Sequence, residues 1–101
     1  MSKKNKSCFV IAPIGNAASE IRRRSDAVLN HIIKPTAKNS GYEAIRADEI
    51  SEPGIITTQV INHILNDDLV IADLTGRNPN VFYELAIRHT IKKPATQLIE
   101  A

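Results

Sequence analysis

The sequence predicts an α/β domain in which a parallel sheet carries helices on both faces. Two short, continuously apolar runs at residues 8–13 and 69–74 have the pattern of strands that are covered on both sides. Between and after these runs, apolar residues recur at helical spacing. Strands that alternate with helices in this way form right-handed βαβ units, and these build a parallel sheet.

The first half of the chain predicts a strand, a helix and a second strand. Residues 8–13 form the first strand, and residues 25–38 form an amphipathic helix. The apolar stripe of this helix consists of Val28, Leu29, Ile32 and Ile33. We expect Pro35 to kink or shorten the helix and Gly41 to end it. Residues 42–47 then form the second strand.

The second half predicts two further helices and two further strands. Apolar residues at helical spacing over residues 56–65 indicate the second helix, and the apolar run at 69–74 follows it. Asn78 and Pro79 form a strong helix start, because Asn caps free amides and Pro loses no hydrogen bond in the first turn. This third helix runs to about residue 91, and residues 95–99 form the fourth strand.

The length of 101 residues is enough for one small domain. Residues 1–7 form a polar lead, and residues 8–101 form the domain. No helix follows the fourth strand, so this apolar strand would lack cover on one side. We therefore expect the natural domain to continue beyond Ala101.

Composition excludes several classes of function. The formal charge is only +2, and the basic runs lie apart from the four aromatic residues, so sequence-specific nucleic-acid binding is not expected. A single cysteine excludes an internal disulfide, and the three histidines lack metal-ligand spacing, so no metal site is expected. The apolar run that follows the lysines near the N-terminus is broken by Pro13 and Gly15. We expect a cytoplasmic chain without a membrane partner.

The strand pattern also predicts where a ligand binds. With the order 2-1-3-4, the crevice lies between the loop after the first strand, residues 14–19, and the loop after the third, residues 75–80. Asp48 flanks it at the end of the second strand. The small and polar residues of these loops are Gly15, Thr75, Gly76, Asn78 and Asn80. They fit either a phosphate cradle or ordinary turn chemistry, because neither loop has a known phosphate-binding pattern.

Glu84 is the strongest candidate for chemistry, since it lies about one turn inside the third helix, near the same crevice. The alternative is a surface ion pair with Arg88, four residues later, and pattern alone favours that alternative. Asp73 either caps the following loop or binds a sugar hydroxyl, and Asp48 has a similar balance. The arginines at residues 22–24 either meet a phosphate or form a solvated basic face.

Three sequence blocks resemble a known group. They are ADLTGRNPNVFYELA at residues 72–86, CFVIAPIG at 8–15 and GYEAIRADEI at 41–50. Together they resemble the nucleoside 2-deoxyribosyltransferase-like and TIR-like nucleotide-binding proteins of bacteria. The resemblance runs from Cys8 to Ile99 and is most specific in the block that ends in YELA. It implies a flavodoxin-like fold.

The resemblance also implies a role for Glu84, which matches the catalytic carboxylate of the group. A carboxylate next to a ribose can trap or stabilise the oxocarbenium charge that develops when an N-glycosidic bond breaks. One departure is informative: the deoxyribosyltransferases carry an aspartate about six residues before this glutamate, where this chain has Asn78. Asn78 cannot protonate a leaving base, whereas the nicotinamide of NAD leaves neutral and needs no acid.

The expected function is therefore that of a TIR-like NAD glycohydrolase, with NAD as substrate and no cofactor. Glu84 is the catalytic residue. The residues expected to bind substrate are Asp48, Asp73, Asn78, Asn80, Gly15 and Gly76. Two alternatives stay open: a module that binds a nucleotide or cyclic dinucleotide without cleaving it, and a true nucleoside 2-deoxyribosyltransferase. The resemblance further implies a place in antiviral defence, with a fused sensor module or self-association as partner.

Overall fold

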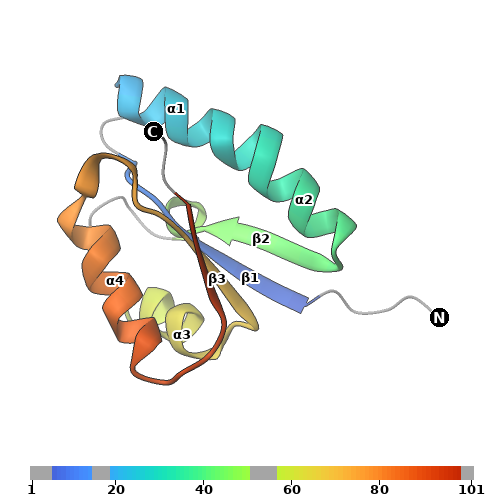
Figure 1. Cartoon of the computed structure of the whole chain (residues 1–101), viewed down its shortest axis with the longest axis vertical. Helices are drawn as coiled ribbons and strands as arrows, with labels where there is room; N and C mark the ends of the chain where they lie inside the picture. The colour runs from blue at the N-terminus through green and yellow to red at the C-terminus, as the bar shows by residue number, and fades with distance from the viewer. Residues whose placement is uncertain (1–5, 15–18, 51–56, 99–101) are drawn as a thin grey trace.

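The structure is a computed structural model, which describes residues 6–14, 19–50 and 57–98. Its centre is a parallel sheet of four strands in the order β2-β1-β3-β4, as the sequence predicts (Figure 1). The strands are β1 (Lys6–Ile11), β2 (Tyr42–Arg46), β3 (Leu69–Asp73) and β4 (Ala95–Leu98). Because every strand is parallel to its neighbours, all four carboxyl ends lie on one edge of the sheet.

Helices cover both faces of the sheet (Figure 1). On one face lie α1 (Glu20–Val28), the π-helical turn η1 (Leu29–Ile33) and α2 (Lys34–Asn39), which continue one another. On the other face lie α3 (Thr58–Asn66) and α4 (Pro79–His89). Two short 3₁₀ turns, η2 (Ala47–Glu49) and η3 (Thr75–Arg77), follow the carboxyl ends of β2 and β3.

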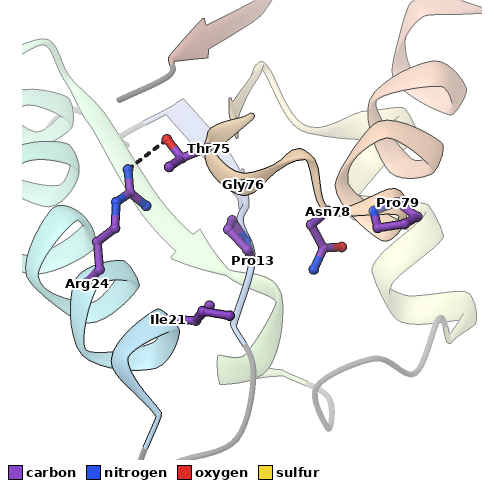
Figure 2. Close-up of a pocket in the computed structure, with 7 residues that line it drawn as sticks. All are labelled: Pro13, Ile21, Arg24, Thr75, Gly76, Asn78 and Pro79. Carbon is purple, nitrogen blue, oxygen red and sulfur yellow. Dashed lines mark hydrogen bonds between the residues drawn. The ribbon is translucent and has the colours of Figure 1, made fainter. Parts of the chain in front are cut away.

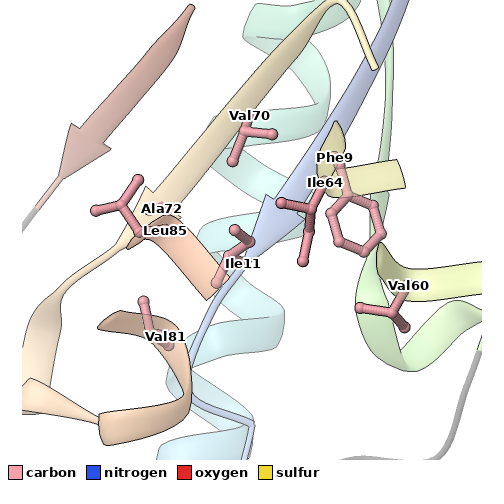
Figure 3. Packing of buried hydrophobic residues seen from close by; sticks show 8 residues of the cluster. All are labelled: Phe9, Ile11, Val60, Ile64, Val70, Ala72, Val81 and Leu85. Carbon is pink, nitrogen blue, oxygen red and sulfur yellow. The ribbon is translucent and has the colours of Figure 1, made fainter. Parts of the chain in front are cut away.

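The central strand β1 supplies both halves of the core, because successive side chains point to opposite faces. Cys8 and Val10 face α2 and η1, whereas Phe9 and Ile11 face α3 and α4. All four are almost fully buried. The cluster around α3 and α4, drawn in Figure 3, consists of Phe9, Ile11, Val60, Ile64, Val70, Ala72, Val81 and Leu85. This packing fixes α4 against the sheet.

The first helix differs from its sequence-based prediction at its start and at Pro35. It begins at Glu20, five residues before the predicted start, because Ser19 caps it by accepting the amide N–H of Arg22 at 3.1 Å. Pro35 was expected to kink or shorten the helix, yet helical structure continues to Asn39. The π turn η1 ends two residues before Pro35, with the Lys34 amide N–H donating to the Leu29 carbonyl oxygen, and such a wider turn makes room for a proline that cannot donate.

The other predicted boundaries agree within a few residues. The second helix begins at Thr58, capped by the Thr57 hydroxyl, while the predicted start at Ile56 lies outside the described residues. The third helix ends at His89, two residues before the predicted end. Gly41 ends α2 with a φ of 85°, a value that only glycine adopts freely. Within the described ranges, no helix is long and apolar enough to cross a membrane.

Candidate functional site

A cavity of about 260 Å³ lies at the carboxyl edge of the sheet, between the ends of β1 and β3. This is the crevice that the strand order predicts. Figure 2 shows α1 on one side and the turn η3 with the start of α4 on the other. The described lining residues are Pro13, Ile21, Arg24, Thr75, Gly76, Asn78 and Pro79.

Arg24 crosses the cavity wall from α1 to the end of β3. Its Nη1 donates to Asp73 Oδ2 at 2.8 Å. Its Nη2 donates to Thr75 Oγ1 at 2.8 Å, the bond drawn in Figure 2. Asp73 is almost fully buried, and its Oδ1 accepts the Thr75 amide N–H at 3.0 Å. Asp73 therefore caps the turn after β3, which was one of the two roles expected for it.

Asp48 belongs to a separate ionic network beside the cavity. Its carboxylate accepts hydrogen bonds from Arg46, which is buried, and from Arg22 of α1 at 3.0 Å. Arg46 also donates to Asp26 and to the hydroxyl of Ser25. Burial acts to lower the pKa of Arg46, but the bonds to Asp48 and Asp26 outweigh it and raise that pKa. Asp48 thus joins β2 to α1 and does not line the described cavity.

Glu84 lies on the buried face of α4 with only 9% of its surface exposed. Burial raises the pKa of its carboxyl from 4.5 to about 7. None of the described residues donates a hydrogen bond to it. It does not line the cavity itself, but it follows the rim residue Pro79 by five positions, which corresponds to about 7.5 Å of helix rise.

The surface ion pair between Glu84 and Arg88, which the pattern alone favoured, is wrong. Arg88 is fully buried, and its guanidinium donates to the carbonyl oxygens of Ile64 at 3.0 Å and of Pro94 at 3.0 and 3.2 Å. Burial lowers the pKa of Arg88. Its side chain therefore joins α3 to the segment before β4, and leaves Glu84 without a cationic partner in the described structure.

The structure brings some of the predicted binding residues together and leaves others apart. Gly76 and Asn78 line the cavity, and Gly76 adopts a φ of 77°. The Asn78 Oδ1 accepts the amide N–H of Asn80 at 2.9 Å, so Asn78 caps α4 as predicted, and Asn80 is exposed outside the cavity. The Asn78 amide nitrogen has no partner among the residues described. Gly15 lies outside the described residues.

The chemistry of the cavity wall is mostly apolar. Of its described lining residues, Arg24 alone is charged, and its charge is balanced by Asp73. Within the part of the chain that the structure covers, no three acidic, histidine or cysteine residues come close enough to hold a metal ion. These features suit an uncharged ring or sugar better than an isolated phosphate.

Arg24 and Ile21 are the lining residues whose place the sequence-based prediction missed. The sequence placed the arginines at residues 22–24 at or just before the start of this helix, where they would either meet a phosphate or form a solvated basic face. The available signal was Ser19 followed by Glu20, a cap and an acidic first turn. A helix that begins there places Ile21 and Arg24 three residues apart on one face, and that face lines the cavity.

Comparison with known proteins identifies the fold. No protein-family model matches the sequence, and no curated protein matches it. Eight chains of solved structures do match. Among them is a 2-desoxiribosyltransferase from Leishmania mexicana, with a TM-score of 0.66 and 12% sequence identity. The match covers 95% of this chain and 65% of that one, so this chain spans about two thirds of its length. The chain has an α/β fold of the flavodoxin-like class, similar to that of this transferase.

Proposed function

We propose that this chain cleaves the N-glycosidic bond between nicotinamide and ribose in NAD, with Glu84 as the carboxylate that acts at the ribose. The observation that carries the proposal is the state of Glu84: it is buried, has no partner among the described residues, and belongs to α4, the helix whose first residue, Pro79, lines the cavity. The solved transferase, which shares the fold, supports nucleoside or nucleotide glycosyl chemistry in general.

A buried carboxylate without a cationic partner is costly, and its pKa of about 7 reflects that cost. A ligand that develops positive charge beside it removes the cost, because the charge favours the ionised form. The breaking of an N-glycosidic bond produces such a charge on the ribose. As the bond breaks, the positive charge of the pyridinium ring moves to the ribose, so Glu84 would interact more strongly with the transition state than with the ground state, as catalysis requires.

The proposed step conserves charge and atoms. The bond from ribose C1′ to the pyridinium nitrogen breaks, and both electrons go to the nitrogen, which leaves in neutral nicotinamide. The ribose carries the positive charge, and the Glu84 carboxylate either bonds to C1′ or stabilises the charge. Water then adds at C1′, displaces the Glu84 carboxylate where it has bonded there, and loses a proton to the solvent, so that ADP-ribose forms and the carboxylate is restored.

Asn78 supports NAD as the substrate. Its amide nitrogen has no partner among the described residues and carries two donor hydrogens at the cavity rim, which can bind a ribose hydroxyl or the carboxamide of nicotinamide. An amide cannot deliver a proton to a leaving purine, but neutral nicotinamide needs none. Gly76 lets the ligand approach the backbone, and Asp73 and Asp48 hold the surrounding turns. Asn80 and Gly15 complete the proposed binding set.

The second candidate is a nucleoside 2-deoxyribosyltransferase, which the solved structure from Leishmania mexicana favours. In this reaction the carboxylate would hold the deoxyribose while one base replaces another. The absence of an acid at Asn78 argues against it, since a purine leaves poorly without protonation. Exchange of base between two deoxynucleosides would identify this activity.

We further propose that the chain acts in antiviral defence and is activated by self-association or by a sensor module. This part of the proposal rests on the resemblance to TIR-like proteins and not on any contact in the structure. Its test is the dependence of NAD cleavage on protein concentration: cleavage per molecule that rises steeply with concentration supports self-association.

The test is to incubate concentrated protein with NAD and follow nicotinamide release in the original chain, in Glu84→Gln and in Glu43→Gln. Glu43 is exposed on β2, away from the cavity, and serves as the matched control. Release in the original chain and the control but not in Glu84→Gln supports the proposal. NAD binding that survives in all three proteins without release favours the non-cleaving binding module.

A further inference from the structure

Three residues form a cluster on the cavity wall, here called the rim cluster: Arg24, Asp73 and Thr75. The guanidinium of Arg24 donates through Nη1 to the carboxylate and through Nη2 to the hydroxyl, each at 2.8 Å. The other carboxylate oxygen of Asp73 accepts the Thr75 amide N–H at 3.0 Å. The three side chains and the Thr75 backbone are thus connected to one another by hydrogen bonds.

The rim cluster joins parts of the chain that are far apart in sequence. Arg24 comes from α1, on one face of the sheet, whereas Thr75 begins the turn η3, which leads into α4 on the other face. Arg24, Thr75 and the next residue, Gly76, all line the cavity. The separation of the two walls is therefore set in part by the length and planarity of one guanidinium group.

We propose that Arg24 is a positioning residue, which holds Thr75 and Gly76 at the distance from α1 that a ligand in the cavity requires. It acts through Asp73 and Thr75, since its own charge is balanced by the buried carboxylate. As regards the ligand, this inference rests on the function proposed above. The inference that Arg24 holds Thr75 and Gly76 in place does not depend on that function.

A guanidinium is suited to this task in a way that an ammonium group is not. Its planar fork presents two donors in fixed directions, and here they reach two different acceptors. The ammonium of Arg24→Lys balances the charge of Asp73 but does not hold the fixed bridge to Thr75. Arg24→Lys therefore keeps a positive charge beside Asp73 but loses the second hydrogen bond, which holds Thr75.

The kinetic effect follows from where the rim cluster lies. Glu84 belongs to α4, and the described structure has no hydrogen bond or ion pair between its carboxylate and Arg24. A displaced rim weakens binding of the ligand in the ground state and transition state alike. We expect Arg24→Lys to raise the KM for NAD about tenfold while kcat changes less than about twofold.

The experiment compares Arg24→Lys and Arg24→Gln with Arg23→Gln, an exposed neighbour on the same helix that serves as control. Two quantities are measured in each protein: the backbone amide chemical shifts of Thr75, Gly76 and Asn78, and the affinity for NAD. We expect both to change in the Arg24 variants and neither to change in the control. Unchanged amide shifts in both Arg24 variants would overturn the proposal.

A double-mutant cycle tests whether Arg24 acts through Asp73 and also covers the case in which Arg24→Gln unfolds. The combination of Arg24→Gln with Asp73→Asn removes both charges, so no buried carboxylate is left unbalanced. We expect the double variant to bind NAD at least as tightly as the single variant, Arg24→Gln or Asp73→Asn, that has the lower affinity. Additive losses would overturn the proposed route. If the original chain binds no NAD, the proposed function fails, and the amide shifts alone decide whether Arg24 holds the rim.

Discussion

Glu84 and Arg88 lie four residues apart on α4, yet the two side chains do not pair. The guanidinium of Arg88 turns to the carbonyl oxygens of Ile64 and Pro94. Glu84 is left buried with a carboxyl whose pKa is about 7. A surface pair would have kept this carboxyl ionised and of little chemical interest. Its isolation makes Glu84 both a source of instability and the candidate for catalysis.

The first prediction concerns stability and pH. Because the pKa of Glu84 is about 7 in the folded state and ordinarily 4.5, the folded chain binds this proton more tightly than the unfolded chain. The free energy of unfolding therefore falls as the pH rises from about 4.5 to about 7, by roughly 3 kcal/mol. Glu84→Gln cannot ionise, so it should be more stable than the original chain at pH 8 and similar at pH 4.

Urea denaturation at these two pH values measures the difference. Glu43→Gln, which removes an exposed carboxylate, should change stability by less than about 0.5 kcal/mol at either pH. A Glu84→Gln variant whose stability advantage is the same at pH 4 and at pH 8 would show that burial does not perturb Glu84.

The second prediction concerns the pH dependence of NAD cleavage. A carboxylate that attacks or stabilises the ribose must be ionised, and Glu84 ionises near pH 7. The value of kcat/KM should rise about tenfold per pH unit below this pH and level off above it. A steady-state profile from pH 5.5 to 9 provides the measurement. A profile that falls as the pH rises through 7 would instead indicate that protonated Glu84 acts as an acid.

The third prediction concerns Arg88 as a structural residue. Arg88→Met keeps much of the side-chain volume but removes three hydrogen bonds to the carbonyl oxygens of Ile64 and Pro94. Buried acceptors without donors are costly, so unfolding should become easier by roughly 2 to 4 kcal/mol. Arg23→Met, an exposed change on α1, is the control. Chemical denaturation of the two variants that gave equal stabilities would contradict this role.

Much of the fold could be predicted from the sequence because its signals are local. The alternation of apolar strands with helical stretches predicted the parallel sheet with helices on both faces, and Asn78 followed by Pro79 predicted the start of α4. The continuation of the helix past Pro35 could not be predicted in this way, because a π turn has no sequence pattern of its own. Packing of Leu29 and Ile33 in the core holds this turn in place.

The candidate site was predictable in position but not in its pairings. The topology rule placed the cavity between the loops after β1 and β3. Asp73 and Asp48 each bind an arginine of α1 that lies far away along the chain, Arg24 for Asp73 and Arg22 for Asp48. Spacing along one helix favoured the wrong partner for Glu84, because it carries no information about Ile64 or Pro94.

The last prediction concerns Gly76, which lines the cavity with a φ of 77°. A Cβ built there meets no atom within 4 Å, so any loss of stability on substitution comes from backbone strain and not from a clash. Asparagine tolerates the left-handed region better than alanine, and valine tolerates it least. The free energy of unfolding should therefore fall in the order Gly76, Gly76→Asn, Gly76→Ala and Gly76→Val, with alanine about 1 kcal/mol below glycine. Denaturant titration of the four proteins tests this order. If alanine proved as stable as glycine, the turn after β3 would not require the left-handed conformation, and small residues there would serve only to leave room for the ligand.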